Sequence, residues 1–564
     1  MNGTRRWLLP ALAYTCVAVF LIWPGVSNPL GAVPGGSRTD LWNGLWSLDF
    51  ARDALLSGQA PWQVDVLAYR GPFGENGGLL PPVDPLAVLL FLPLGALGIP
   101  LGYNVLILTR LVLGGLIAQR FVEELAEHHG ATPEGALRGG WVAGVALTGA
   151  PVLIAGVHNG TSEAANATGL IFAVWMGWRF GRDPSLRGAL WLAVGLLWAT
   201  LSSWYVAVLA FGYAGLVALF AAQSWPFIKR WIPIGVGLVL VAPWLGGVMH
   251  LLQPGPSNLS SHSFALSEML SAEGPTQVAG LEENFAALDL QGWLGKSGNR
   301  DVAVHSPSER GQGFFHNGHI AWAIALSGLI GLWRLGRKEL PMLGLAVVSV
   351  LLSFGTSLEI GGQSIWMPLA TLKSYPGFSQ LGLPFRFGIG AAVILAVGAG
   401  LWASRRSSAW CWGVVGLVLI QLRFVSPLAG GVPATALDTS SALHALKAAP
   451  DGAVLHFPLV GQQPTLYSQR IHDKPVTSAL NWASSEIDLA LWSAAREFLM
   501  RENVEGFQGR AEELGIRYLV VHAKDPKLRG DANWSLYRII RDSGDFEVLG
   551  SNESGADVEV YALW

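Results

Sequence analysis

Side chains that could move protons lie at the edges of apolar segments in this sequence. Asp40, Asp84 and Glu163 are carboxylates, and His158 stands five residues before Glu163. Carboxylates and imidazoles are the usual groups for general acid–base catalysis. Structural roles compete, because Asp40 and Asp84 stand where helix N-caps are expected and Glu163 could favour a helix start through the dipole. The residues alone leave both interpretations open.

Two arginines occupy positions where an unpaired charge is energetically unfavourable. Arg110 lies midway along the apolar residues 101–117, where an unpaired charge costs roughly 2.5–3.5 kcal/mol or more in a membrane. Arg110 is therefore expected to face the interior and to pair with a carboxylate or a phosphate. Arg386 opens another apolar segment, and its guanidinium suits bidentate phosphate recognition. The structural alternatives are an ion pair for Arg110 and a snorkelling side chain for Arg386.

Several kinds of site are absent from the sequence. It contains no Walker loop, no dinucleotide fingerprint after a strand, no Gly-x-Ser-x-Gly elbow and no zinc-spaced Cys/His set. The net charge of -3 argues against a nucleic-acid partner. Cys16 and Cys411 lie in apolar runs, so buried, unreactive thiols are expected rather than a disulfide.

The elements that position these residues are predicted to be membrane-spanning helices. Of 564 residues, 51% are hydrophobic and 13% charged, against roughly 25% charged in soluble domains. About 20 apolar residues cross the hydrocarbon core, and about eleven candidate spans of that character follow from this rule. The fold class expected is a mostly α, polytopic transmembrane bundle with spans near residues 7–23, 101–117, 140–157, 169–178, 190–201, 205–221, 232–249, 321–333, 342–354, 387–402 and 412–421.

The distribution of basic residues predicts the orientation. Arginines and lysines recur at alternate connections, and basic loops stay in the cytoplasm. The N-terminus is therefore expected in the cytoplasm, with an uncleaved first span, because no small-residue cleavage site follows it. The apolar residues 86–97 are too short to span and lie between prolines, so they predict a re-entrant or interfacial helix. The expected location is the plasma (inner) membrane, with multiple passes.

Three pieces are then expected outside the cytoplasm: residues 25–85, 253–315 and those after about 427. In the first, leucines from Leu41 to Leu56 recur near helical spacing and predict an amphipathic surface helix that ends at Gly58. Asp49 and Asp53 would form a solvated cluster with Arg52 on it. The domain division expected is a membrane module of residues 1–426 and a soluble extracytoplasmic α/β domain of 427–564, with strands near 453–457, 517–521, 546–549 and 558–562.

Taken in order, several short motifs resemble the GT-C superfamily of polytopic glycosyltransferases, which use lipid-linked sugars. The likeness to its bacterial members covers most of the chain and is weakest in residues 253–315. It rests on the order of loose motifs, which are DLWNGLWSLDF from Asp40, LSGQAPW from Leu56, Tyr103-Asn104, HNGTSE from His158, PFRF from Pro384, VLHFPL from Val454 and LGIRYLVVH from Leu514.

The resemblance implies a catalytic carboxylate in the first outer loop, and Asp40 matches its position. Asp40 would act as general base on an acceptor hydroxyl while the sugar leaves its polyprenyl phosphate with inversion. Arg110 and Arg386 would hold the leaving phosphate. Asp84 and Glu163, with His158 nearby, would orient the acceptor, or a divalent cation if one is used. Asp84 departs from the family pattern, since some members carry a His-Pro-Pro element there.

The partners implied are a lipid-linked sugar donor, a glycan, lipid or protein acceptor, and the bilayer, with no nucleic acid. A carrier or flippase of lipid-linked glycans is one alternative, although the sequence lacks the two related halves expected of a transporter. A non-catalytic assembly factor of the cell envelope is the other. Replacement of Asp40 by Asn without effect would favour this last interpretation.

Overall fold

The computed structural model describes residues 5–564 except 38, 68, 70, 72–77, 80–83, 222–319, 335–339, 361–362, 374–383, 426–429, 438–439, 458–462, 478–485, 502, 524–530 and 552–557. These residues fall into two compact units. The helical unit contains residues 5–39, 84–221 and 320–435, and the mixed unit contains residues 40–79 and 436–564. The expected span at 232–249 and the expected outer loop 253–315 lie outside the described residues.

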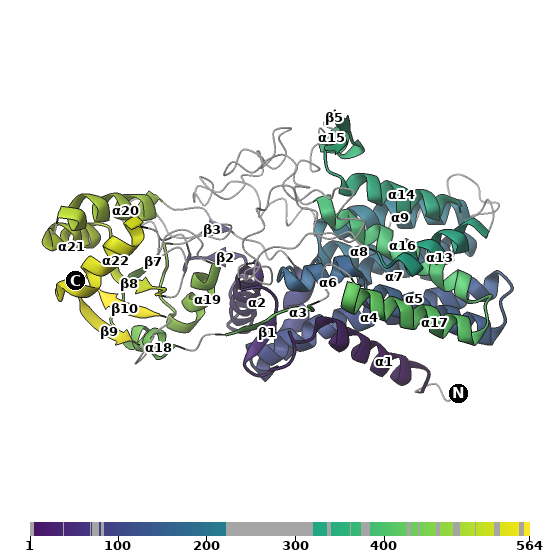
Figure 1. Cartoon of the computed structure of the whole chain (residues 1–564), viewed down its shortest axis with the longest axis horizontal. Coiled ribbons are helices and arrows are strands. Elements are labelled where there is room, and N and C mark those ends of the chain that lie inside the picture. Colours follow the sequence, from purple (N-terminus) through teal and green to yellow (C-terminus); the bar gives the residue numbers. More distant parts are fainter. Residues whose placement is uncertain are drawn as a thin grey trace. The chain divides into compact units, whose positions relative to one another are not determined.

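The helical unit consists of apolar helices that lie side by side (Figure 1). Its α-helices are α1 (Arg5–Ile22), α3 (Pro85–Leu94), α4 (Ile99–His128), α5 (Pro133–Thr148), α6 (Pro151–His158), α7 (Thr168–Arg182), α8 (Leu186–Ser202), α9 (Trp204–Ala221), α13 (Trp322–Arg334), α14 (Leu340–Ser353), α15 (Pro368–Lys373), α16 (Gly388–Ala403) and α17 (Ser408–Ile420). Short helical turns are η2 (Gly95–Leu97), η5 (Pro384–Phe387) and η6 (Gln421–Val425), and the strand pairs are β1 (Ala32–Pro34) with β6 (Ala434–Ala436) and β4 (Ser357–Ile360) with β5 (Gln363–Trp366).

Three helices of the described residues are long and apolar enough to cross a membrane. They are α4, the segment Pro133–His158 that comprises α5 and α6, and the segment from η5 through α16. Shorter apolar helices occupy most of the other expected positions, among them α1, α8, α9, α13, α14 and α17. The structure thus contains helices of membrane-spanning character, while the number of spans stays a prediction.

Glycines allow these helices to pack closely. A Cβ on Gly328 of α13 would lie 2.6 Å from the carbonyl oxygen of Leu395 in α16, and one on Gly398 would lie 2.4 Å from the carbonyl oxygen of Gly328. Close backbone approach at small residues is the usual means of helix association in lipid. Cys411 is buried as expected, but Cys16 is exposed, because its face of α1 is not covered by the described helices.

Two of the expected spans differ in detail from the structure. The segment expected at 140–157 is interrupted at Gly149–Ala150, and α6 restarts with Pro151 in its first turn, where proline is well tolerated. The apolar segment 86–97 forms the ten-residue α3 followed by η2. Gly98 then turns the chain into α4 with φ of 90°, a conformation that favours glycine.

The mixed unit is built on a four-stranded sheet with the order β7-β8-β10-β9. Strands β7 (Ala453–Phe457) and β8 (Ile516–Val521) are parallel, and β10 (Glu559–Ala562) is antiparallel to both β8 and β9 (Glu547–Ser551). These bounds lie within two residues of the strands predicted from sequence. The remaining elements are α2 (Leu41–Leu56), β2 (Gln63–Val64), β3 (Gly78–Leu79), α18 (Ser441–Ala448), α19 (Gln463–His472), α20 (Glu486–Phe498), η8 (Leu499–Arg501), α21 (Val504–Glu513) and α22 (Asp531–Ser543).

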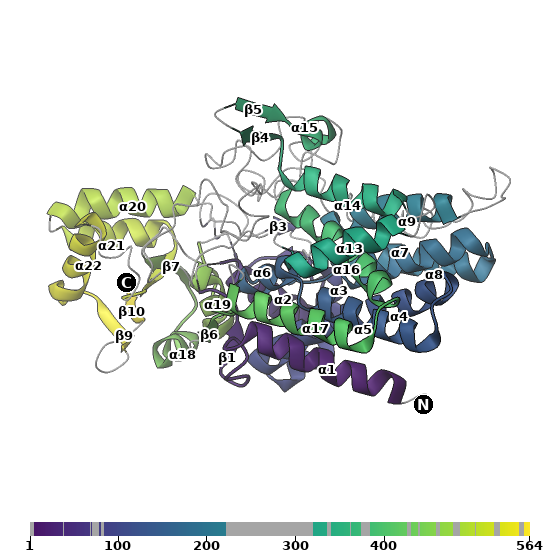
Figure 2. The same cartoon turned by 45° about the vertical axis from the view of Figure 1, so that its right-hand side comes forward.

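Alternating strand residues form two separate apolar cores, because successive side chains of a strand point to opposite faces. Leu455 and Leu519 join one core with α20, α21 and α22. Val454 and Val520 join the other core with α18, α19 and Trp46 of α2. Figure 2 shows α18, α19, α20, α21 and α22 around the strands.

Helix α2 therefore corrects two predictions. Its apolar face was expected on the membrane surface, and residues 25–85 were expected to belong to the membrane module. In the structure Leu41, Leu45 and Trp46 are buried, and residues 40–79 pack with the C-terminal residues. The amphipathic pattern was identified correctly, but the surface that covers it is protein.

Candidate functional site

A buried ion pair joins α3 to α4 in the helical unit. Arg110 Nη1 lies 2.6 Å from Asp84 Oδ2, and the two residues are 2% and 6% exposed. The backbone amide of Ala87 donates to Asp84 Oδ1 over 2.9 Å. Asp84 is thus the N-cap of α3, as one interpretation predicted, and also the carboxylate partner of Arg110. Arg110 is paired, as the cost of a lone charge in an apolar helix predicts.

The turn between α6 and α7 contributes to the same pair. Arg110 Nη1 donates to the Ser162 carbonyl oxygen over 2.7 Å, and Ser162 Oγ donates to Asp84 Oδ2 over 3.3 Å. Gly160 begins this turn with φ of 67°, and Thr161 Oγ1 donates to the carbonyl oxygen of Gly156. These bonds fix the turn, so that Ser162 and the next residue are held in the interior.

Glu163 forms a second buried ion pair. Its Oε1 lies 2.7 Å from Arg386 Nη2, and both residues are 7% exposed. The Arg386 guanidinium stands 5.1 Å from the ring centre of Tyr205, within the range of a cation–π contact. Helix α7 begins only at Thr168, so Glu163 does not occupy its first turn. Arg386 is buried and paired, and the snorkelling alternative is therefore wrong.

The two pairs form one cluster, which we call the paired-charge cluster: Asp84, Arg110, Glu163 and Arg386. Ser162 and Glu163 are adjacent in the chain, and each contacts one of the arginines. Tyr103 of α4 is fully buried and lies within electrostatic range of Arg110, Glu163 and Asp84. Four charged side chains from four parts of the sequence thus meet in the interior of the helical unit.

The arginines of this cluster retain unused donors. Among the described residues, Arg110 Nε and Nη2 and Arg386 Nε are buried without a hydrogen-bond partner, as is the Tyr103 hydroxyl. A buried guanidinium normally has its donors satisfied. Unused donors on two arginines in one cluster are therefore suited to an anionic ligand, and phosphate oxygens match guanidinium geometry.

His158 lies beside this cluster in sequence and is also buried. Its Nδ1 lies 3.3 Å from the side-chain oxygen of Asn159, and its carbonyl oxygen accepts from the amide of Gly36 over 2.7 Å. The end of α6 is thereby attached to the chain within the first predicted outer loop, residues 25–85.

Asp40 is described within the mixed unit, as the residue immediately before α2. Its carbonyl oxygen accepts from the Gly44 amide over 2.9 Å, and its Oδ1 lies 3.5 Å from Asn43 Nδ2. Its carboxylate makes no hydrogen bond to the first backbone amides of the helix. The N-cap interpretation of this side chain therefore lacks the bond that defines a cap.

Asp49 and Asp53 have a partner that local spacing did not predict. Arg470 of α19 contacts both carboxylates, with its Nε 2.8 Å from Asp49 Oδ2. Asp49 is buried, so the expected solvated cluster is wrong for this residue, and the contact of Arg52 with Asp53 is between neighbours in the chain.

A divalent cation fits these residues poorly. Asp84 and Glu163 each already neutralise an arginine, and the described part of the chain contains no group of three or more His, Cys, Asp or Glu side chains arranged to hold a metal. Hard cations such as Mg²⁺ need several oxygen ligands together. No step below is therefore assigned to a cation.

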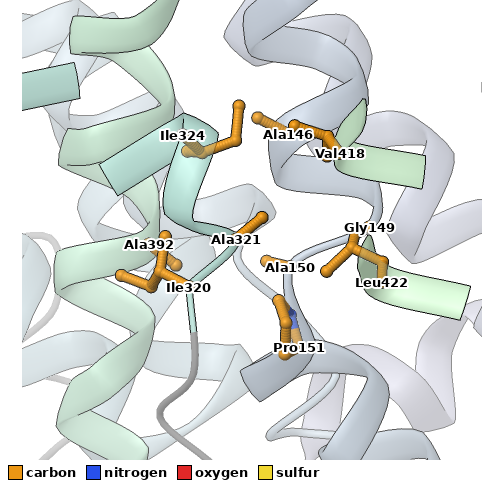
Figure 3. Close-up of a pocket in the computed structure, with 10 residues that line it drawn as sticks. All are labelled: Ala146, Gly149, Ala150, Pro151, Ile320, Ala321, Ile324, Ala392, Val418 and Leu422. Atoms are coloured by element: carbon orange, nitrogen blue, oxygen red, sulfur yellow. The ribbon is translucent and has the colours of Figure 1, made fainter. Parts of the chain in front are cut away.

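A separate apolar crevice lies between α5, α13, α16 and α17 (Figure 3). Its enclosed volume is about 10 Å³, which is at the lower limit for one water molecule. Its lining has no charged side chain, and consists of Ala146, Gly149, Ala150, Pro151, Ile320, Ala321, Ile324, Ala392, Val418 and Leu422. It cannot hold a sugar, and the polar site is the paired-charge cluster.

Sequence reasoning missed two contributors to the cluster. Ser162 contributes a backbone carbonyl, which no side-chain pattern reveals. Tyr205 follows the break between α8 and α9 at Ser203, and an aromatic residue directly after such a break was the available signal.

No protein-family model and no curated protein matches this sequence. Among solved structures, the arabinofuranosyltransferase AftD from Mycobacteria matches with a TM-score of 0.57 and 16% identity, over 99% of this chain and 41% of AftD. This chain thus spans about two fifths of the length of AftD. The archaeal oligosaccharyltransferase AglB from Archaeoglobus fulgidus matches with a TM-score of 0.47 and 12% identity, over 95% of this chain and 71% of AglB. ArnT from Cupriavidus metallidurans matches with a TM-score of 0.45 and 13% identity, over 100% of this chain and 99% of ArnT.

Only the likeness to AftD exceeds a TM-score of 0.5 among these three, and at 16% identity it concerns the fold. It extends over nearly the whole chain, in agreement with the order of motifs found in the sequence. The structural neighbours of this chain are GT-C glycosyltransferases, and the chain has the GT-C fold.

Proposed function

We propose that this protein is a membrane glycosyltransferase that transfers a sugar from a polyprenyl-phosphate-linked donor to an acceptor hydroxyl on the extracytoplasmic face. The observation that carries the proposal is the paired-charge cluster, whose two buried arginines retain unused donors in a GT-C fold. AftD, one neighbour with this fold, is by name an arabinofuranosyltransferase. By analogy with AftD, we propose that this chain also transfers a sugar.

Arg110 and Arg386 would bind the phosphate of the donor. Each arginine uses one terminal nitrogen for its carboxylate, and Nε of each has no partner among the described residues. As the bond between the anomeric carbon and the phosphate oxygen breaks, negative charge develops on the phosphate. Fixed guanidinium donors stabilise such charge most in a site from which water is excluded.

Asp40 would be the general base. In the proposed step the acceptor oxygen forms a bond to the anomeric carbon, and its proton passes to the Asp40 carboxylate. The electrons of the broken bond leave with the polyprenyl phosphate, and attack opposite the leaving group inverts the anomeric centre.

Asp84, Glu163 and His158 would place the acceptor and hold the arginines in position. Asp84 and Glu163 each hold one arginine through a bond of 2.6 or 2.7 Å. In sequence Asp40 follows Gly36 by four residues, and the Gly36 amide is bonded to His158. The acceptor would be a glycan, a lipid or a protein, and the proposed location is the plasma membrane, with the N-terminus in the cytoplasm and residues 427–564 outside.

The test uses the full chain purified into lipid nanodiscs. Synthetic polyprenyl-phosphate pentoses and hexoses are supplied with simple glycoside acceptors, and the released polyprenyl phosphate and the glycosylated product are measured. Asp40→Asn should lower turnover about 10²–10⁴-fold, the usual contribution of a general base. Asp183→Asn, at an exposed residue after α7, is the matched control and should leave turnover unchanged.

Full turnover by Asp40→Asn would refute the base assignment. If the wild-type chain turned over none of these donors but moved them across vesicle membranes, the carrier interpretation would replace the proposal. Inactivity in both assays would favour an assembly factor.

A further inference from the structure

Helix α2, which follows Asp40 directly, is an integral part of the mixed unit. Trp46 is 1% exposed and packs in one apolar core with Val454 and Val520 of the sheet and with Leu466 of α19. Burial of an aromatic side chain of this size removes a large apolar area from water and stabilises the packing. The helix is therefore held by packing before any polar contact is considered.

Arg470 of α19 adds a charged contact to this packing. Its Nε donates to Asp49 Oδ2 over 2.8 Å, and its Nη2 donates to Asp53 Oδ2. The Arg470 and Asp49 side chains are only 13% and 11% exposed. Asp49 and Asp53 are four residues apart on α2, so they lie on one face of the helix. One guanidinium thus fixes both the position and the rotation of α2.

Neighbouring residues of α19 contact the preceding turns of α2. Trp46 Nε1 donates to Gln469 Oε1 over 2.9 Å, and Gln469 is 1% exposed. The rings of Trp42 and Tyr467 lie 5.8 Å apart. Contacts therefore run along α2 from Trp42 to Asp53, on the side that faces α19.

Helix α19 is in turn attached to the sheet. After it, the Val454 amide donates to the Pro475 carbonyl oxygen over 2.9 Å, and the Thr477 amide donates to the Val454 carbonyl oxygen over 3.1 Å. The chain that follows α19 thus extends the edge of the sheet beside β7. Helix α19 is therefore anchored to the sheet and supports α2.

From these contacts we infer that Arg470 and Gln469 are positioning residues for Asp40. The inference rests on the proposed function, in which Asp40 is the base. Asp40 is joined to the first turn of α2 by the bond from the Gly44 amide, so a rotation or tilt of the helix moves Asp40 with it. The C-terminal residues would then be required for the chemical step, and not only for recognition of the acceptor.

Positioning matters because catalytic groups act only within a narrow geometry. Misplacement by about 1 Å can lower turnover about 10²-fold. Side chains that contact the substrate need to be held within about 0.5 Å of the productive geometry. A purely structural contact would behave differently. Its loss would lower thermal stability but leave the turnover of the surviving folded protein unchanged.

The test compares Arg470→Gln and Arg470→Lys with Arg510→Gln as the matched control. Arg510 is an exposed arginine of the same unit, paired with Glu513. Two quantities are measured on the full chain in nanodiscs: amide hydrogen exchange of residues 41–56, and turnover of the polyprenyl-phosphate sugar on which the wild type is active. Arg470→Gln should increase exchange in residues 41–56 and lower kcat at least 10-fold, with KM for the donor changed less than 3-fold.

Arg470→Lys should recover part of kcat, because an ammonium can still reach one carboxylate. Arg510→Gln should match the wild type in both measurements. Faster exchange in residues 41–56 with unchanged kcat would overturn the positioning role. Unchanged exchange in Arg470→Gln would show that Arg470 does not hold α2. Inactivity of the wild type on every donor would instead refute the proposed function, whereas the exchange measurement would still decide whether Arg470 holds α2.

Discussion

At the scale of residues, the paired-charge cluster explains why ionisable groups persist in an apolar unit. A buried ion pair adds little net stability, but removal of one partner leaves an uncompensated charge. Arg386 has Glu163 as its carboxylate partner, 223 positions away in the chain, so each charge depends on the other. Asp84 has a similar dependence on Arg110 and also caps α3.

Glu163→Gln is expected to lower the stability of the folded chain by about 3–5 kcal/mol, because it leaves Arg386 buried beside a neutral amide. The double variant Glu163→Gln/Arg386→Met removes both charges and should regain most of that loss. Thermal unfolding in nanodiscs measures both changes.

The same double variant should remain inactive in the sugar-transfer assay, because the phosphate-binding guanidinium is gone. Recovered stability without recovered turnover distinguishes a functional ion pair from a purely structural one. Recovery of both would show that the pair serves folding alone. Arg179→Gln, in an exposed pair with Glu124, is the control, and surface pairs contribute only about 0–1 kcal/mol.

At the scale of elements, the short helix α3 depends on a close approach to α4. A Cβ on Gly102 of α4 would lie 2.6 Å from the carbonyl oxygen of Leu94, at the end of α3. Since α3 carries Asp84 at its start and α4 carries Arg110, the spacing of these helices sets the geometry of the ion pair.

Gly102→Ala should therefore lower both turnover and the melting temperature, because the backbone of α3 has to move away from α4. A few kcal/mol is the expected scale for a forced overlap in a packed core. Gly413→Ala in α17 is the control, since a Cβ there meets nothing within 4 Å. That control should be neutral or stabilising by roughly 0.5–1 kcal/mol, as alanine is preferred over glycine inside helices.

At the scale of the whole molecule, the mixed unit contains two histidines, His456 and His472, whose burial makes the stability of the chain depend on pH. His456 is fully buried, with its Nδ1 2.9 Å from His522 Nε2 and its ring 5.8 Å from that of His472. Burial, with His522 and His472 nearby, lowers the pKa of His456 well below its usual value. Burial, and then Lys474, lowers the pKa of His472 to about 3.

Both histidines are therefore neutral in the folded chain at a pH where the unfolded chain is protonated. The unfolded state binds more protons below its own pKa of about 6.5, so the free energy of unfolding falls as the pH falls from about 6.5 toward 3. At pH 4.5 one such histidine lowers the free energy of unfolding by roughly 2–3 kcal/mol relative to its value above pH 6.5.

The melting temperature of the full chain between pH 7.5 and 4.5 measures this effect. In His456→Gln the melting temperature should fall less steeply as the pH is lowered. His444→Gln, at an exposed position of α18, should keep the wild-type slope. An unchanged slope in His456→Gln would show that His456 does not titrate with unfolding.

Local patterns in the sequence predicted many of the helices and the four strands of the sheet. Apolar runs and alternating patterns depend on neighbours within one or two turns, so α2, α4 and the four strands of the sheet follow from spacing alone. The cost of a lone charge in an apolar helix likewise predicted that Arg110 would be paired, and the order of motifs predicted the GT-C fold.

Which side chains meet depends on how distant segments pack, and local patterns do not predict it. Arg470 pairs with Asp49 across 421 residues, and Arg386 pairs with Glu163 across 223. The apolar face of α2 looks the same in sequence whether lipid or protein covers it, and here the mixed unit covers it. Local pattern specifies the surface that an element must bury, whereas the partner depends on how distant segments pack. For this reason the amphipathic helix was predicted correctly, and its attachment to the C-terminal residues was not.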